Sequence, residues 1–219
     1  EHVRQHGLAP VDVACIPAAA GGPKGLALLP FDRLFYREWL SRPGVQVELL
    51  GASVGAWRMA ALAQPDPIAA LDRLQDGYVR DQNYAERPSP QDVALAIARI
   101  ARKVLGDPTL EVRAGVSLTI ITSRARGPLQ GKESKLAFAR ATLSNAVSRH
   151  WLAAHLERVL FVAGEPGFLT EPFDDFGLVR VALDAGNAGD ALLASGTIPL
   201  LCTPVRDIAG APTGNYWDG

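Results

Sequence analysis

The chain has 219 residues, of which 48% are hydrophobic and 21% are charged, and its formal net charge is −1. This composition is typical of a globular domain that can bury a substantial core, and the near-neutral charge gives no reason to expect nucleic-acid binding. No apolar run reaches the ~20 residues that a membrane span requires. The two cysteines, Cys15 and Cys202, lie in apolar runs, so we expect buried free thiols and no disulfide framework. These features predict a cytoplasmic or membrane-peripheral protein. They do not exclude secretion.

The first part of the chain alternates strands and helices across two glycine-containing turns. The apolar run 11–20 predicts a buried strand, and apolar residues at helical spacing predict a helix over 26–40. A second strand over 45–51 leads into a helix from about 54 to 64. Strand, glycine turn and helix in repetition are typical of a parallel sheet covered by helices.

The rest of the chain continues this α/β pattern. The expected elements are, in order, helices over 66–82 and 90–106, a strand over 116–125, a helix over 134–156, strands over 158–164 and 178–184, and a helix over 189–199. The tail is expected to be loop with one short strand. Because no internal repeat or low-complexity linker divides the sequence, we predict a single α/β domain over 1–219.

A serine between two glycines, Gly51-Ala52-Ser53-Val54-Gly55, lies where the second strand meets its helix. The pattern G-x-S-x-G is that of a nucleophile elbow, a sharp turn that exposes the serine hydroxyl. Gly51 and Gly55 would support the turn, since they remove side chains that would collide with the strand and the helix. The positive end of the helix would stabilise an oxyanion at this point. The strand-to-helix context favours Ser53 as a nucleophile over a glycine-rich turn with a serine cap.

A second glycine-containing segment, AAAGGPKG (18–25), follows the first strand. At Gly21 and Gly22 no side chain covers the backbone N–H groups, which makes both candidates for an oxyanion hole. The segment lacks G-x-G-x-x-G, so it is not a dinucleotide-binding loop. In a phosphate-binding loop the lysine follows a glycine and precedes Ser or Thr, whereas Lys24 precedes Gly25. No His or Cys spacing indicates zinc. We therefore expect no cofactor and no metal.

The general base that would activate Ser53 has two candidate sources. His150 and His155 are the only histidines after Ser53, and both lie in the helix predicted over 134–156, on different faces. Asp218, in the closing NYWDG, is the alternative. An aspartate is a weak base at its reference pKa of about 3.9, so it would need a short hydrogen bond to the serine in a pocket with little water.

Three motifs in order, GGPKG, GASVG and a closing DG, resemble the patatin-like phospholipase family. The stretch ALLASGTIPLLCTPV (191–205) also resembles the helix and proline segment that precedes the Asp-Gly motif of that family. The resemblance implies a three-layer α/β/α domain over 1–219 with a mostly parallel central sheet, in a family whose members continue beyond the Asp-Gly motif. It implies a Ser–Asp dyad without histidine, with Ser53 as nucleophile, Asp218 as base and Gly21 and Gly22 in the oxyanion hole.

The expected activity is therefore hydrolysis of lipid esters through an acyl-enzyme. Alternatives are an acyltransferase that uses the same serine, and an inactive lipid- or protein-binding relative, because Ala20 replaces the first of three family glycines. The expected partners are a lipid or small ester substrate and a membrane surface that the basic segment 123–135 would contact, although a solvated loop is favoured for it. The oligomeric state stays open.

Overall fold

The computed structural model describes residues 1–82, 86–106, 110–127, 155–165 and 177–219. A 7-stranded sheet at its centre has the strand order β1-β2-β3-β4-β5, with β6 and β7 attached beside β3. The strands are β1 (Cys15–Ala18), β2 (Val47–Ala52), β3 (Val116–Ala125), β4 (Leu156–Ala163), β5 (Leu178–Ala182), β6 (Val205–Arg206) and β7 (Asn215–Asp218). Strands β1, β2 and β3 run parallel, as do β4 and β5, whereas β4 is antiparallel to β3.

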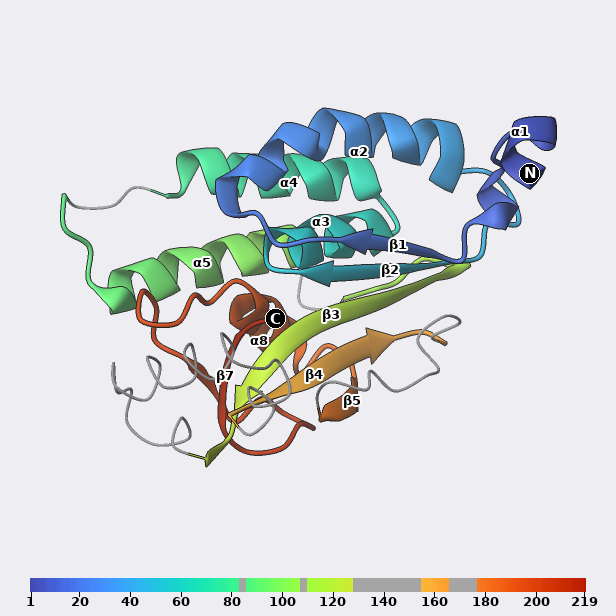
Figure 1. Cartoon of the computed structure of the whole chain (residues 1–219). Coiled ribbons are helices and arrows are strands. Elements are labelled where there is room, and N and C mark those ends of the chain that lie inside the picture. The colour runs from blue at the N-terminus through green and yellow to red at the C-terminus, as the bar shows by residue number, and fades with distance from the viewer. Residues whose placement is uncertain (83–85, 107–109, 128–154, 166–176) are drawn as a thin grey trace.

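Helices pack around this sheet, consistent with a three-layer α/β/α fold (Figure 1). They are α1 (His2–His6), α2 (Leu29–Phe35), α3 (Val54–Ala63), α4 (Pro67–Arg80), α5 (Pro90–Leu105) and α8 (Ala188–Ser195). Two short 3-10 helices, η1 (Pro10–Asp12) and η2 (Gly22–Leu28), and a π-helical turn, η3 (Tyr36–Leu40), complete the described helices. The predicted α/β class with a mostly parallel central sheet is confirmed.

Helix α3 occupies the centre of the core. All ten of its residues are buried, because it packs on β2 and β3 while α4, α5 and α8 pack against it. A helix that is buried on every side and carries a single charged residue is stable only in such surroundings. The neighbouring helices are amphipathic and begin at sequence-encoded caps: Asp66 caps α4, and Ser89 forms a capping box with Asp92 at the start of α5.

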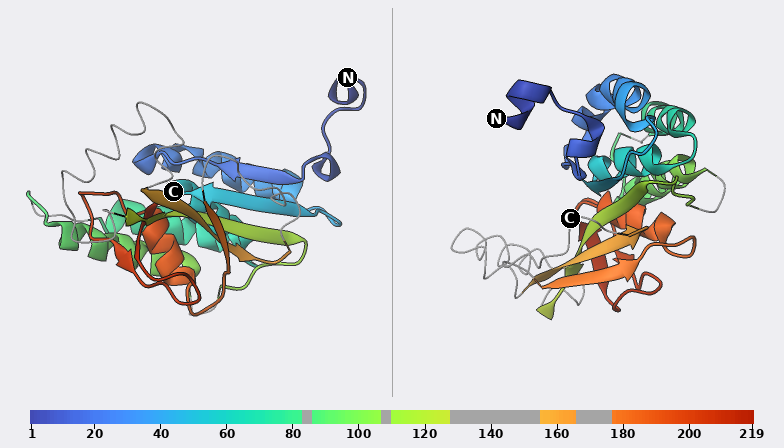
Figure 2. Two further views of the ribbon diagram at one scale, coloured as in Figure 1. Left: turned by 60° about the horizontal axis from the view of Figure 1, so that its bottom comes forward. Right: turned by 90° about the vertical axis from the view of Figure 1, so that its right-hand side faces the viewer.

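The tail differs from its prediction as loop with one short strand. It forms two antiparallel strands, β6 and β7, and β7 joins the central sheet by pairing antiparallel with β3. Ala52, the last residue of β2, lies opposite Ile121 of β3, and Asp218 of β7 lies opposite the next residue, Thr122. Strands β2 and β7 therefore meet end to end beside β3, and Figures 1 and 2 show the C-terminus next to the tip of β2.

The predicted helix over 134–156 falls largely outside the described residues. Its described end is not helical, since His155 lies in a turn and Leu156 begins β4. The basic segment 123–135 begins within β3, and its residues from 128 onward are also outside the described ranges. Cys202 is buried as expected, whereas Cys15, on the edge strand β1, is only half-buried. Both described thiols are free.

Candidate active site

Ser53 lies on a strained turn between β2 and α3. Its backbone has φ 56° and ψ −134°, a conformation that non-glycine residues rarely adopt and that costs about 1–3 kcal/mol. Ser53 as a whole is 8% exposed, so the residue is largely enclosed by the fold. The strand, the sharp turn and the helix together match the geometry of a nucleophile elbow.

Gly51 and Gly55 allow the close approaches that form this turn. A Cβ at Gly51 would lie 2.5 Å from the backbone of Ala56, at the start of α3. A Cβ at Gly55 would lie 2.2 Å from the carbonyl oxygen of Ala18, at the end of β1. Both predicted supports are therefore positions where a side chain would collide with backbone, and the second brings the start of α3 against the segment that contains Gly21 and Gly22.

The glycine loop, residues 18–25, lies beside the elbow. Gly25 packs so closely on Val54 that an added Cβ would lie 2.5 Å from its side chain. Gly22 begins the 3-10 helix η2 with φ +54°, which favours glycine, whereas Gly21 has an extended φ of −178° that any residue can adopt. The structure thus brings both predicted oxyanion-hole residues into the loop next to Ser53, with Gly22 as the conformationally demanding position.

Asp218 is brought to Ser53 by the end-to-end placement of β2 and β7. Burial raises the pKa of Asp218 from its ordinary value of 3.8 to about 6, although hydrogen bonds from the Ser53 side chain and the Gly219 backbone lower it. Its oxygen Oδ1 is buried and has no hydrogen-bond partner in the described part of the chain. A carboxyl group with this pKa is ionised at neutral pH yet binds a proton far more readily than a solvated aspartate.

A buried hydroxyl on α8, that of Ser195, was not singled out from the sequence. It accepts a hydrogen bond from the Ser53 backbone N–H at 2.9 Å and donates one to the Ile121 carbonyl at 2.8 Å. Two residues on, the carbonyl oxygen of Thr197 accepts a hydrogen bond from the Asp218 backbone N–H at 3.0 Å. The segment that ends α8 therefore holds the nucleophile strand and the base strand together. In the sequence, Ser195 lies near the end of the helix predicted over 189–199 and within the stretch 191–205 of the motif resemblance, and neither assigns it a role.

Of the two histidine candidates, only His155 lies in the described residues, and it does not join this arrangement. His155 lies in the turn before β4, where its carbonyl accepts a hydrogen bond from Arg126 at 2.7 Å, and the following residue pairs with Ala125 at the far end of β3. His150 lies outside the described residues.

Trp57 and Arg58, which follow the elbow, are both buried. The Trp57 indole N–H donates a hydrogen bond to the Leu192 carbonyl of α8 at 2.9 Å.

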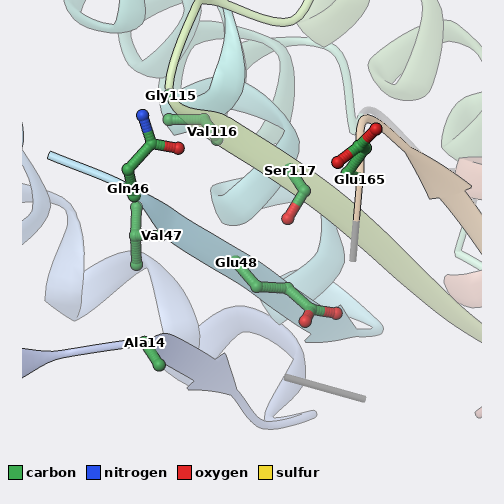
Figure 3. A pocket seen from close by; sticks show the side chains of 8 residues that line it. All are labelled: Ala14, Gln46, Val47, Glu48, Gly115, Val116, Ser117 and Glu165. Atoms are coloured by element: carbon green, nitrogen blue, oxygen red, sulfur yellow. The ribbon is translucent and has the colours of Figure 1, made fainter. Parts of the chain in front are cut away.

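A pocket lies at the opposite end of the strands from Ser53. It has a volume of about 460 Å³, and Figure 3 shows Gln46, Glu48, Ser117 and Glu165 around it, at the amino ends of β2 and β3 and the end of β4. Glu48 accepts a hydrogen bond from Thr119 at 2.8 Å. Parallel sheets usually bind ligands at the carboxyl ends of their strands, where Ser53 lies, so this pocket is not the candidate active site.

Comparisons with protein-family models, with curated proteins and with solved structures gave no match to this chain. Within the described residues, no three His, Cys, Asp or Glu side chains are grouped so that they could hold a metal ion. None of the helices in the described ranges is long and apolar enough to cross a membrane. The function must therefore be inferred from the geometry and chemistry around Ser53 and Asp218.

Proposed function

We propose that the protein is a serine acyl hydrolase that cleaves carboxylic esters of lipids through a Ser53–Asp218 dyad. One observation carries the proposal: a strained, enclosed serine at a strand-to-helix turn is hydrogen-bonded to a carboxyl group whose pKa burial raises to about 6. The two residues are 165 positions apart in the chain. A structural turn would require neither the strain at one nor the incompletely paired carboxyl group at the other.

The chemistry follows from these positions. The Ser53 hydroxyl oxygen attacks the ester carbonyl carbon while Asp218 accepts the hydroxyl proton. The carbonyl oxygen becomes an oxyanion, which the backbone N–H groups of Gly21 and Gly22 and the positive end of α3 stabilise. Asp218 then gives its proton to the leaving alcohol, and the carbon–oxygen bond of the ester breaks. Water, deprotonated by the same carboxylate, hydrolyses the acyl-enzyme and restores Ser53.

The assignment of lipid esters rests on the motif resemblance to patatin-like phospholipases. The order GGPKG, GASVG and DG, with the α8 segment before the last motif, supports it. Ala20, which stands where that family has a further glycine, keeps its backbone N–H and therefore keeps a donor in the loop.

Hydrolysis of a short p-nitrophenyl ester tests the proposal. We expect Ser53→Ala and Asp218→Asn each to lower kcat/KM by at least about 10³-fold while the far-UV circular dichroism spectrum is unchanged. The matched control is the double variant His150→Ala with His155→Ala, which should keep most of the activity. Loss of activity in a folded double-histidine variant, together with near-normal activity of Asp218→Asn, would replace the dyad with a histidine mechanism.

Two further results separate the alternative functions. A wild-type protein that is folded but hydrolyses no ester and binds lipid would be an inactive relative. Formation of a new ester when an alcohol is added, at the expense of free acid, would identify an acyltransferase.

A further inference from the structure

A second cavity, of about 480 Å³, lies between the edge strand β1, the segment η2–α2 and helix α3. Its volume is in the range of small-molecule binding sites. The large apolar side chains that line it are Ile16, Leu28, Phe31, Phe35, Met59 and Leu62. Figure 1 shows α2 running above β1, which forms the edge of the sheet.

The rim and the floor of this cavity differ in exposure. Leu28 and Phe31, at the rim, are 46% and 57% exposed, whereas Met59 and Leu62 on α3 are 2% and 1% exposed. Phe31 also stacks on Phe35 with ring centroids 5.6 Å apart, which fixes one wall. Large apolar side chains that remain in water at the mouth of an apolar cavity are energetically unfavourable unless a ligand covers them.

The cavity borders the glycine loop of the candidate active site, although Ser53 and Asp218 do not line it. Residues 18–21 of the glycine loop line it, and the carbonyl oxygen of Ala18 is the atom against which Gly55 of the elbow packs. Gly25 both lines the cavity and contacts Val54, the residue after the nucleophile. The loop that would hold the oxyanion is therefore also the upper wall of the cavity.

The charged groups in the cavity define the polarity of its ligand. Asp32 and Arg58 form a buried bidentate ion pair with two hydrogen bonds of 2.6 Å, so their charges neutralise each other. Lys24, in the glycine loop, is exposed and has no hydrogen-bond or ion-pair partner in the part of the chain that the structure describes. The available positive charge in the cavity lining thus belongs to the glycine loop, which also borders the elbow.

We propose that this cavity holds the acyl chain of the substrate, and of the fatty acid that the reaction releases. The chain lies along Phe31, Met59 and Leu62, and its carbonyl end lies at the glycine loop. After hydrolysis, the carboxylate of the fatty acid pairs with Lys24. The inference rests on the proposed acyl hydrolase function and deepens it, because it assigns a place to the apolar part of the ester.

Binding of a fatty acid to the full chain with Ser53→Ala tests this directly, since it requires no catalysis. A fluorescent probe with a dodecanoyl chain is displaced by unlabelled dodecanoate, and the Kd is compared between variants. Leu28→Gln with Phe31→Gln should weaken binding about tenfold, because two apolar contacts are lost. Leu34→Gln is the matched control: Leu34 is 58% exposed on the same helix but does not line the cavity, so its Kd should change less than about twofold.

Hydrolysis by the active protein gives the second measurement. The rim double variant should lose activity on a p-nitrophenyl dodecanoate ester by about tenfold and keep activity on the acetate ester, whereas Leu34→Gln should keep both. Equal Kd values and equal chain-length profiles in the rim and control variants would overturn the inference and leave the hydrolase intact. If the wild type bound the fatty acid, the rim substitutions weakened that binding, and the wild type hydrolysed no ester, the cavity would be supported as a fatty-acid site and the hydrolase function would be rejected. A further outcome is a wild-type dimer that the rim substitutions disrupt and the control substitution does not. If such a protein bound no fatty acid, the occupant of the cavity would be a second copy of the chain, and the inference would be overturned.

Discussion

The raised pKa of Asp218 predicts that the candidate base lowers the stability of the protein at neutral pH. Burial raises the pKa of Asp218 from 3.8 to about 6. The folded state therefore holds this proton more tightly than the unfolded state, and the free energy of unfolding falls as the pH rises from about 3.8 to about 6. The whole shift corresponds to about 3 kcal/mol, and because Asp218 is only partly buried, solvent screening reduces the expected effect to about 1–2 kcal/mol.

Asp218→Asn removes the charge and keeps an oxygen that can accept the hydrogen bonds from Ser53 and Gly219. We expect the variant to be more stable than the wild type by about 1–2 kcal/mol at pH 7.5, with a difference that shrinks toward zero near pH 4. Urea unfolding at the two pH values measures this. Asp92 is the control with the opposite sign, since hydrogen bonds with Ser89 lower its pKa, so Asp92→Asn should destabilise the protein at pH 7.5. A variant Asp218→Asn that is less stable than the wild type at pH 7.5, or equally stabilised at pH 4, would refute the reasoning.

Two further predictions concern activity. Because Asp218 must be ionised to accept a proton, kcat/KM for a p-nitrophenyl ester should rise about tenfold per pH unit below about pH 6 and level off above it; a profile that is flat between pH 5 and 7 would contradict this. The Ser195 hydroxyl accepts a hydrogen bond from the backbone N–H of Ser53, so Ser195→Ala should lower kcat by about tenfold or more with little change in KM. Thr197→Val is the control, because the Thr197 hydroxyl donates its hydrogen bond to Leu193 of α8, and this variant should not lower kcat in the folded protein.

Much of the fold was predictable because its signals are local. The strand-to-helix turn at Ser53 is encoded by the glycines on either side and by the apolar runs before and after it. Helices α4 and α5 follow from apolar spacing, from prolines at their first positions and from the caps Asp66 and Ser89. Strand β3 matches its predicted bounds because five of its ten residues are β-branched and no glycine or proline interrupts them.

The partnership of Ser53 and Asp218 could not be derived from the local pattern. It depends on the pairing of β7 with β3, and a four-residue strand in a tail of glycines and prolines carries almost no periodicity signal. The residues themselves left Asp218 and the two histidines as alternatives, and the motif resemblance alone favoured Asp218. The role of Ser195 was hidden for the same reason, since its two hydrogen bonds reach residues 74 and 142 positions away.

The most direct test of the central claim is covalent labelling of the wild-type protein with a fluorophosphonate probe, followed by mass spectrometry of the peptides. An activated serine attacks the phosphorus and displaces fluoride, whereas an ordinary serine hydroxyl does not react. We expect one adduct per chain, on Ser53, which disappears in Ser53→Ala and is strongly slowed in Asp218→Asn. A folded wild-type protein that takes up no probe, or that is labelled equally in Ser53→Ala, would contradict the assignment of Ser53 as the nucleophile.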